Sequence, residues 1–174
     1  MKTKITTERL SLDILTINDH AFIRELVNTE GWLKFIGDRK IYSDEDAIAY
    51  IEKINSMPNF TYWIVRLKET CEPIGIITFL KRNYLARHDI GFAFLPEYNS
   101  KGYAYEATRE VLSVVSREPQ HTIILATTIP GNVRSVNLLT KLGFKFEREI
   151  EAANNKVYIY SRNNESITII NSKD

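Results

Sequence analysis

The chain has 174 residues, of which 44 % are apolar and 26 % charged, and its 23 Lys and Arg nearly balance 22 Asp and Glu. This composition is typical of a folded globular domain and excludes disordered and collagen-like chains. The near-neutral charge argues against nucleic acid and anionic membranes as partners, and no apolar run reaches the roughly 18 residues of a membrane-spanning helix. With a single cysteine, Cys71, and no apolar leader segment, we expect one soluble, cytoplasmic domain over residues 1–174.

The first third of the sequence predicts one strand followed by two helices. Residues 7–15 alternate apolar and polar side chains, as a half-buried strand does. The second helix begins after Ser43, which is a favourable N-cap, and ends before Pro58. The first helix is predicted from an apolar stripe that consists of Phe22, Ile23, Leu26 and Val27.

The remaining sequence predicts strands and helices in alternation. Strands rich in β-branched and aromatic residues are expected over residues 60–67, 74–80, 89–95 and 122–129. Helices are expected over residues 102–117 and 132–142. A closing hairpin should pair residues 144–150 with 156–160, and residues 163–174 should form an extra strand or a tail. We therefore predict an α/β or α+β fold, with a mixed, mostly antiparallel central sheet of about six to seven strands flanked by about four helices.

The segment between the strand 89–95 and the following helix is a candidate phosphate site. A helix that begins near Gly102 exposes its first backbone N–H groups, and the macrodipole adds positive potential there. Gly102 would let a ligand approach the backbone, and Lys101 could add a positive charge. Glycine at a loop–helix junction also has a purely conformational explanation.

A second group of polar residues opens the helix 132–142. Asn132 and Ser135 are three residues apart, so they share one face near the N-terminus of this helix. Structural roles alone would account for both ends, because Asn132 is a good N-cap and Gly143 a good helix stop.

Together these segments resemble the GNAT superfamily of acetyl-CoA-dependent N-acetyltransferases, and within it the ribosomal-protein serine/alanine N-acetyltransferase branch. The resemblance covers nearly the whole chain: TERLSLDIL at the start, IGIITF and DIGFAF in the centre, NSKGYAYEA at the loop and NVRSVNLLTKLGF further on. The family loop pattern, Gln/Arg-x-x-Gly-x-Gly/Ala, departs here only at its first position, which is Asn99.

The resemblance implies that acetyl-CoA is the co-substrate and indicates which residues hold it. The end of the strand 89–95, at Phe94 and Leu95, would offer main-chain hydrogen bonds to the pantetheine arm and the acetyl group. Asn132 would contact the pantetheine side, with Ser135 one turn further into the helix. The pyrophosphate would bind the loop residues Asn99, Ser100, Lys101, Gly102, Tyr103 and Ala104.

The implied reaction is direct attack of a neutral primary amine, from a protein N-terminus or a small molecule, on the acetyl thioester. Asp89 stands where some family members carry a catalytic Glu, and Glu97 is the second candidate base. The Tyr that often protonates the CoA thiolate is replaced by Leu139, so Ser135 becomes the candidate acid. Both carboxylates also have structural explanations, since Asp89 could pair with Arg87 and Glu97 could be a solvated loop acid.

Other chemistries find little support in the sequence. Cys71 lies between two glutamates that would raise its thiol pKa, which argues against a nucleophilic role. No metal is expected, because His20, His88 and His121 belong to three separate predicted elements.

Two alternatives to the enzyme stay open at this point. A catalytically silent acyl-CoA-binding sensor is suggested by the missing Tyr and by the short side chain of Asp89. An unrelated phosphate-binding protein would require the resemblance to be accidental. The apolar segment 31–37 around Trp32 is expected to pack in the core, although a substrate lid or a homodimer surface would suit it as well.

Overall fold

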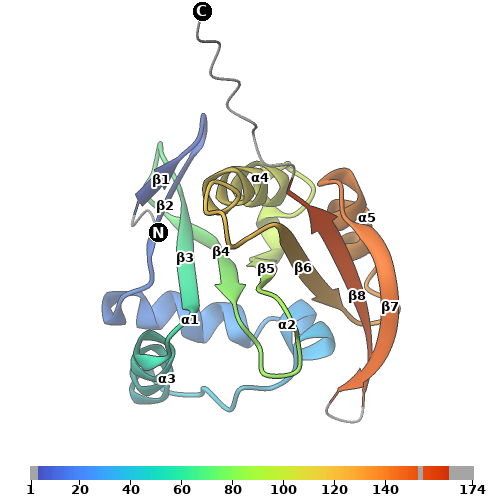
Figure 1. Cartoon of the computed structure of the whole chain (residues 1–174). Coiled ribbons are helices and arrows are strands. Elements are labelled where there is room, and N and C mark those ends of the chain that lie inside the picture. The colour runs from blue at the N-terminus through green and yellow to red at the C-terminus, as the bar shows by residue number, and fades with distance from the viewer. Residues whose placement is uncertain (1–3, 153–154, 165–174) are drawn as a thin grey trace, which may run out of the picture.

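The computed structural model describes residues 4–152 and 155–164, and within them eight strands form one sheet flanked by five α-helices (Figure 1). The strands are β1 (Lys4–Thr6), β2 (Leu10–Ile14), β3 (Phe60–Leu67), β4 (Pro73–Leu80), β5 (Asp89–Phe94), β6 (Ile123–Thr128), β7 (Lys145–Ala152) and β8 (Asn155–Asn163). The helices are α1 (His20–Val27), α2 (Glu30–Phe35), α3 (Asp44–Ser56), α4 (Tyr103–Val115) and α5 (Val133–Lys141), with two short 3-10 helices, η1 (Ile17–Asp19) and η2 (Pro96–Tyr98).

The sheet is mixed and mostly antiparallel, as predicted. Its strand order is β1-β2-β3-β4-β5-β6-β8-β7, and the pair β5 and β6 is the parallel one among the described strands. The expected count of six to seven strands and four helices was slightly low. The closing hairpin β7–β8 joins the sheet through β8, which pairs with β6 and leaves β7 at the edge.

The additional strand and helix arise near the N-terminus. The Thr7 N–H donates to the Leu10 carbonyl at 2.9 Å, and this turn separates β1, which lies before the predicted strand 7–15, from β2, which lies within it. The apolar segment 31–37 contains most of helix α2, whose N-cap Thr29 accepts from the Trp32 N–H at 3.4 Å. Trp32 is 6 % exposed and packs in the core, whereas Leu33 and Ile36 are 42 % and 41 % exposed, so the expected core packing of the segment 31–37 is confirmed for Trp32 and wrong for these two residues.

The two helices predicted near the N-terminus are confirmed by their caps and buried faces. All four apolar residues of the stripe predicted for α1 are buried. In α3 the Ser43 hydroxyl accepts from the Asp46 N–H at 3.1 Å, while the Asp46 carboxylate accepts from the Ser43 N–H at 3.0 Å. This capping box explains why the helix begins where the sequence indicates.

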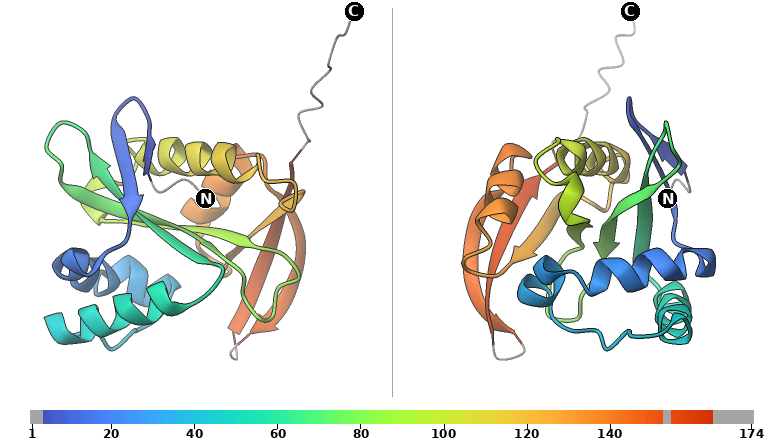
Figure 2. Two further views of the ribbon diagram at one scale, coloured as in Figure 1. Left: turned by 60° about the vertical axis from the view of Figure 1, so that its left-hand side comes forward. Right: turned by 180° about the vertical axis from the view of Figure 1, so that it is seen from behind.

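Two apolar cores lie on the two faces of the sheet (Figure 2). Helices α1, α2 and α3 cover one face, where Ile23, Trp32 and Ile51 pack on Ile64 and Ile76. Helices α4 and α5 cover the other face, where α4 packs over the centre of the sheet through Ala107 and Val111 and α5 packs through Leu139. Leu95, at the end of β5, belongs to the first core, so the end of this strand connects both layers.

His88 and His121 meet although they lie far apart in the sequence. Their ring centroids are 4.8 Å apart, and each ring lies 4.9 Å from Phe79. The two histidines belong to separate elements, as predicted, and the fold brings this pair together. No group of three metal-binding side chains is found in residues 4–152 and 155–164.

This cluster predicts a loss of stability on mild acidification. Burial, together with His121 and Lys81, lowers the pKa of His88, while Glu118 acts in the opposite direction. Because the folded pKa lies below the unfolded value of about 6.5, the unfolded chain binds the proton more tightly, and the free energy of unfolding falls as the pH drops through about 6.5. Thermal unfolding between about pH 7.5 and about pH 5 should show a smaller fall for His88→Gln than for the wild type. His20→Gln is the control and should lose as much stability as the wild type over this pH range. An identical loss of stability in His88→Gln and the wild type would exclude His88 as the cause.

Strand β8 is the last element in the described part of the chain. Strand β8 extends to Asn163, and the predicted extra strand or tail at 163–174 otherwise lies outside the described residues. No helix in the described part of the chain is long and apolar enough to cross a membrane.

Candidate functional site

The centre of the site is a split between strands β5 and β6. The two strands pair in parallel at Asp89 and Leu125, and the Leu125 N–H donates to the His88 carbonyl at 2.9 Å. Beyond this point β5 continues to pair with β4 on its other side, up to Phe94 opposite Gly75. In the described sheet, the edge of β5 that faces β6 therefore has no strand partner over residues 90–94. Unpaired backbone N–H and C=O groups need hydrogen-bond partners, so this edge can bind an extended ligand.

The loop that follows β5 leads to the uncapped N-terminus of α4. Gly102 is its N-cap with φ of +84°, and no side chain caps this end. The first helical hydrogen bond runs from the Glu106 N–H to the Gly102 carbonyl at 3.0 Å, so the N–H groups of residues 103–105 precede the first full turn. Lys101 is exposed, with its Nζ 5.3 Å from the centre of the Tyr98 ring. These donors and the macrodipole favour a bound phosphate or pyrophosphate.

The loop backbone is itself unusual at Ser100. Its φ is +62°, in the left-handed region that non-glycine residues rarely adopt. Together with Gly102, this residue turns the chain sharply between η2 and α4. Asn99 and Ala104 flank the turn and are half-buried. The residues from Asn99 to Ala104 thus form the compact loop that the sequence motif indicates.

Asn132 and Ser135 begin α5, which follows β6 and so lies on the other side of the split. The Asn132 side chain accepts from the Ser135 N–H at 3.2 Å, so the N-cap explanation of Asn132 is confirmed. Ser135 is 9 % exposed. Leu139, at the position where many family members carry a Tyr, is buried in the core and brings no hydroxyl group to the site.

Asp89 opens β5 at the closed end of the split. Its side chain is 1 % exposed, and both carboxylate oxygens accept from the Arg82 Nε at 3.0 Å. Burial raises the pKa of the Asp89 carboxyl, and the Arg82 guanidinium opposes this shift. The partner expected from the sequence, Arg87, instead donates to the Thr122 hydroxyl at 3.3 Å. Since β5 spans six residues, Asp89 lies about 20 Å along the strand from the loop at its other end.

Glu97 lies at the opposite end of β5 and is exposed to solvent. It lines a hollow of about 750 Å³ on the face covered by α1, beside Leu95. Two further carboxylates line this hollow, Glu25 from α1 and Glu72 from the chain before β4. Of the two candidate bases, the structure therefore places Glu97, rather than Asp89, near the end of the split that leads into the loop.

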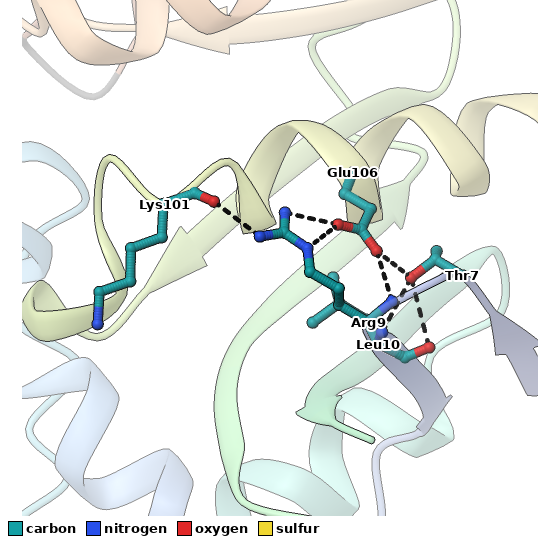
Figure 3. A network of polar contacts seen from close by, with 5 residues as sticks. All are labelled: Thr7, Arg9, Leu10, Lys101 and Glu106. Atoms are coloured by element: carbon teal, nitrogen blue, oxygen red, sulfur yellow. Dashed lines mark hydrogen bonds and ion pairs between the residues drawn. The ribbon is translucent and has the colours of Figure 1, made fainter. Parts of the chain in front are cut away.

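Glu106 and the turn before β2 form a polar network that sequence reasoning missed (Figure 3). The Arg9 guanidinium donates to the Glu106 carboxylate and also to the Lys101 carbonyl in the loop, at 3.1 Å. The residues belong to the TERL and GYAYEA motifs, which are separated by more than ninety positions along the chain. Both motifs were noticed, but nothing in the sequence indicated that they touch.

Comparisons with known proteins agree with this geometry. The family model described as acetyltransferase (GNAT) domain matches residues 9–145. An uncharacterized N-acetyltransferase of Bacillus subtilis, YnaD, is 32 % identical over 145 residues, covering 82 % of this chain and 83 % of that protein. A solved GNAT-family acetyltransferase from Bacillus anthracis is 26 % identical, with a TM-score of 0.77 over 92 % of this chain and 98 % of that one. RimL, a ribosomal L7/L12 alpha-N-protein acetyltransferase in complex with coenzyme A, shares the fold with a TM-score of 0.80 at 14 % identity, covering 92 % and 97 % of the two chains.

Proposed function

Because the chain belongs to the GNAT acetyltransferase family, we propose that it transfers the acetyl group of acetyl-CoA to a primary amine in a ternary complex. The observation that carries the proposal is the run from the unpaired edge of β5 to the uncapped N-terminus of α4. An extended amide chain that ends in a pyrophosphate matches such a run in both shape and hydrogen-bonding groups. The single cysteine, Cys71, is free and favours a reducing, cytoplasmic setting.

The co-substrate would be held mainly by the backbone. Main-chain groups at Phe94 and Leu95 would bond the pantetheine arm, and the loop from Asn99 to Ala104 would hold the pyrophosphate. Lys101 would add a positive charge beside this loop. Asn132, although it caps α5, borders the open side of the split and would contact the pantetheine. Backbone donors at the split would also stabilise negative charge on the acetyl oxygen in the transition state.

The chemical step needs a base and a proton donor. The amine nitrogen attacks the acetyl carbon and forms the amide bond, the C–S bond breaks, and CoA leaves as a thiolate. Glu97 is our choice of base, because it is open to solvent at the mouth of the hollow and can take the ammonium proton directly or through water. Asp89 remains a second candidate, although its carboxylate is occupied by Arg82. Ser135 is the candidate that relays to the thiolate the proton that the nitrogen loses as the amide forms, so that CoA ends as the thiol.

The hollow beside Leu95 is the proposed entrance for the acceptor. Glu25, Glu72 and Glu97 give its wall a negative charge, and Arg24, the cation that lines it, is paired with Asp44 at 3.0 Å. An amine that arrives as a cation is attracted to such a wall. Both a peptide N-terminus, the kind of acceptor named for RimL, and a small amine satisfy this chemistry.

The first test is thermal unfolding with acetyl-CoA, CoA, ATP and NADH, followed by a panel of amines assayed for CoA release. A ligand at about 100 times its Kd adds about 2.7 kcal/mol to the free energy of unfolding, which raises the Tm of a chain of this length by about 5–10 °C. We expect this shift with acetyl-CoA and CoA alone. No shift with either would contradict the proposal.

The role of Glu97 is tested in the same assay. We expect Glu97→Gln to lower kcat/KM for the amine about tenfold, below the 10²–10⁴-fold effect of a tightly positioned base, because the side chain is exposed. The Tm shift with acetyl-CoA should not change. Glu52→Gln, an exposed carboxylate on α3 away from the hollow, is the matched control. Full activity of Glu97→Gln would exclude it as the base.

A silent acyl-CoA sensor is the second candidate function. It is favoured by two observations at the site, the buried Leu139 in place of a Tyr and the ion pair that occupies Asp89. Its signature would be a Tm shift with CoA but no CoA release with any amine of the panel. Turnover of even one amine would exclude it.

A further inference from the structure

The turn between β1 and β2 is attached to helix α4 through one carboxylate. Glu106 accepts from the Thr7 hydroxyl at 2.5 Å and from the Arg9 backbone N–H at 2.9 Å with its Oε1. Its Oε2 accepts from Nε and Nη2 of Arg9, each at 2.7 Å. The Glu106 side chain is 15 % exposed, so it is largely withdrawn from water. Burial opposes its ionisation, but these bonds outweigh the effect and lower the pKa of Glu106.

The same arginine also contacts Lys101 and Tyr103 at the start of α4 and lies close to Gly102 between them. Its Nη1 donates to the Lys101 carbonyl at 3.1 Å, and its guanidinium carbon lies 4.4 Å from the centre of the Tyr103 ring. A Cβ atom added to Gly102 would come within 3.3 Å of Nη2. Figure 3 shows the Arg9 side chain extended between the Lys101 carbonyl and the Glu106 carboxylate.

These contacts restrain a helix start that no side chain caps. The N-cap of α4 is a glycine without a side chain, and Ser100 and Gly102 both have left-handed backbone angles. Glycine adopts such an angle without strain, but at Ser100 it persists only where surrounding contacts hold it. The hydrogen bond to the Lys101 carbonyl sets the plane of the Lys101–Gly102 peptide, and thereby the direction of the N–H groups that follow.

We propose that Arg9, held by Glu106 and Thr7, is a positioning residue that orients the loop Asn99–Ala104 for the pyrophosphate of acetyl-CoA. This inference rests on the proposed function. Arg9 acts through the loop backbone and not by its charge, because the Glu106 carboxylate already pairs with the guanidinium through Oε2. Its effect is therefore specific to the pyrophosphate end of the co-substrate and leaves the thioester end unchanged.

The experiment compares acetyl-CoA with S-acetylpantetheine, which carries the thioester but lacks the pyrophosphate. For Arg9→Ala and Arg9→Lys we expect the Kd of CoA, measured by calorimetry, and the KM of acetyl-CoA to rise about tenfold, which corresponds to about 1.4 kcal/mol. The kcat with acetyl-CoA and the kcat/KM with S-acetylpantetheine should stay close to wild type. Glu106→Gln keeps the side-chain shape and should raise the Kd of CoA and the KM of acetyl-CoA by a smaller factor. It replaces Arg9→Ala in the experiment if that variant does not fold.

Lys4→Ala is the matched control, because it removes an ion pair, to Asp13 at 3.8 Å, from the same β1–β2 hairpin without touching the loop. An unchanged Kd for CoA in the Arg9 variants would overturn the inference, as would an equal loss with both acyl donors, which indicates general unfolding. A wild-type Kd in Arg9→Lys would show that charge alone suffices and would overturn it too. Failure of the wild-type protein to bind CoA would instead contradict the proposed function.

Discussion

Replacement of Asp89 by alanine is expected to lower the free energy of unfolding by about 3 kcal/mol, the lower end of the range for breaking a buried ion pair. Asp89 is 1 % exposed, and its loss leaves the Arg82 guanidinium without its partner. The Arg82 side chain is 33 % exposed, so water partly compensates it, which is why the lower end applies. Denaturant unfolding at neutral pH measures the effect.

The reciprocal variant, Arg82→Met, predicts the direction in which stability changes with pH. In Arg82→Met, the Asp89 carboxylate is buried without its cation, and burial then raises its pKa against the weaker effect of the backbone hydrogen bond at Asp89. A folded pKa above the unfolded value means that the folded state binds the proton more tightly, so stability is greatest at low pH and falls as the pH rises through the folded pKa. The double variant Asp89→Leu/Arg82→Met should recover most of the loss, because an apolar pair of similar volume often replaces an ion pair without cost.

Activity measurements on the Asp89 variants, with Asp89→Asn added, distinguish a structural from a catalytic role of Asp89. We expect activity to fall only in proportion to the unfolded fraction. If Asp89→Asn instead kept the wild-type Tm and lost more than about 100-fold in kcat, Asp89 would be the base and Glu97 would not.

The second large effect is expected for Gly75→Ala, with a loss of about 2–3 kcal/mol in the free energy of unfolding, at the upper end of the cost of overpacking. Gly75 lies opposite Phe94 in the β4–β5 pair. An added Cβ would come within 2.4 Å of the Phe94 Cδ1 and 2.7 Å of the Ala93 carbonyl oxygen. Because that oxygen belongs to the backbone, relief requires movement of β5 itself, and we expect the Kd of CoA to rise as well.

Gly31→Ala is the matched control for this change. Gly31 lies in helix α2, and its added Cβ would meet no atom within 4 Å. Alanine favours helices over glycine by about 1 kcal/mol, so this variant should be neutral or slightly stabilised. In a double-mutant cycle, Phe94→Ala should recover part of the Gly75→Ala loss. Full additivity of the two changes would show that the ring does not cause the clash.

Much of the fold could be predicted because the relevant signals are local. The stripe of α1, the Ser43 cap of α3 and the apolar run of β6 depend on burial period and capping chemistry within one element. The loop from Asn99 to Ala104 could also be located, since a strand, a sharp turn and a helix start follow one another along the chain. Strand β1 was missed because it has three residues with one buried apolar side chain, Ile5, which is too short a pattern to show a period of two.

For the candidate site, too, the local features could be predicted from the sequence and the long-range contacts could not. Sequence alone indicated the loop, the cap Asn132 and the absence of a Tyr at position 139, all of which are properties of single segments. It could not decide between Asp89 and Glu97 as the base, because their difference lies in burial and in the partner of each. Asp89 pairs with Arg82 rather than Arg87, because the path of the chain between β4 and β5 brings Arg82 to the Asp89 carboxylate and Arg87 to the Thr122 hydroxyl.

The sequence by itself therefore determined the type of fold, most of the order of elements, the position of the loop from Asn99 to Ala104 and the family. The tertiary structure alone decided where β5 and β6 separate, which carboxylate is open to solvent, and that Arg9 reaches the loop at Lys101. The physical reason is the distance along the chain over which each interaction acts. Periodicity and capping act within a few residues of one backbone segment, whereas strand register and the pairing of charged side chains join segments that only the packed sheet brings together.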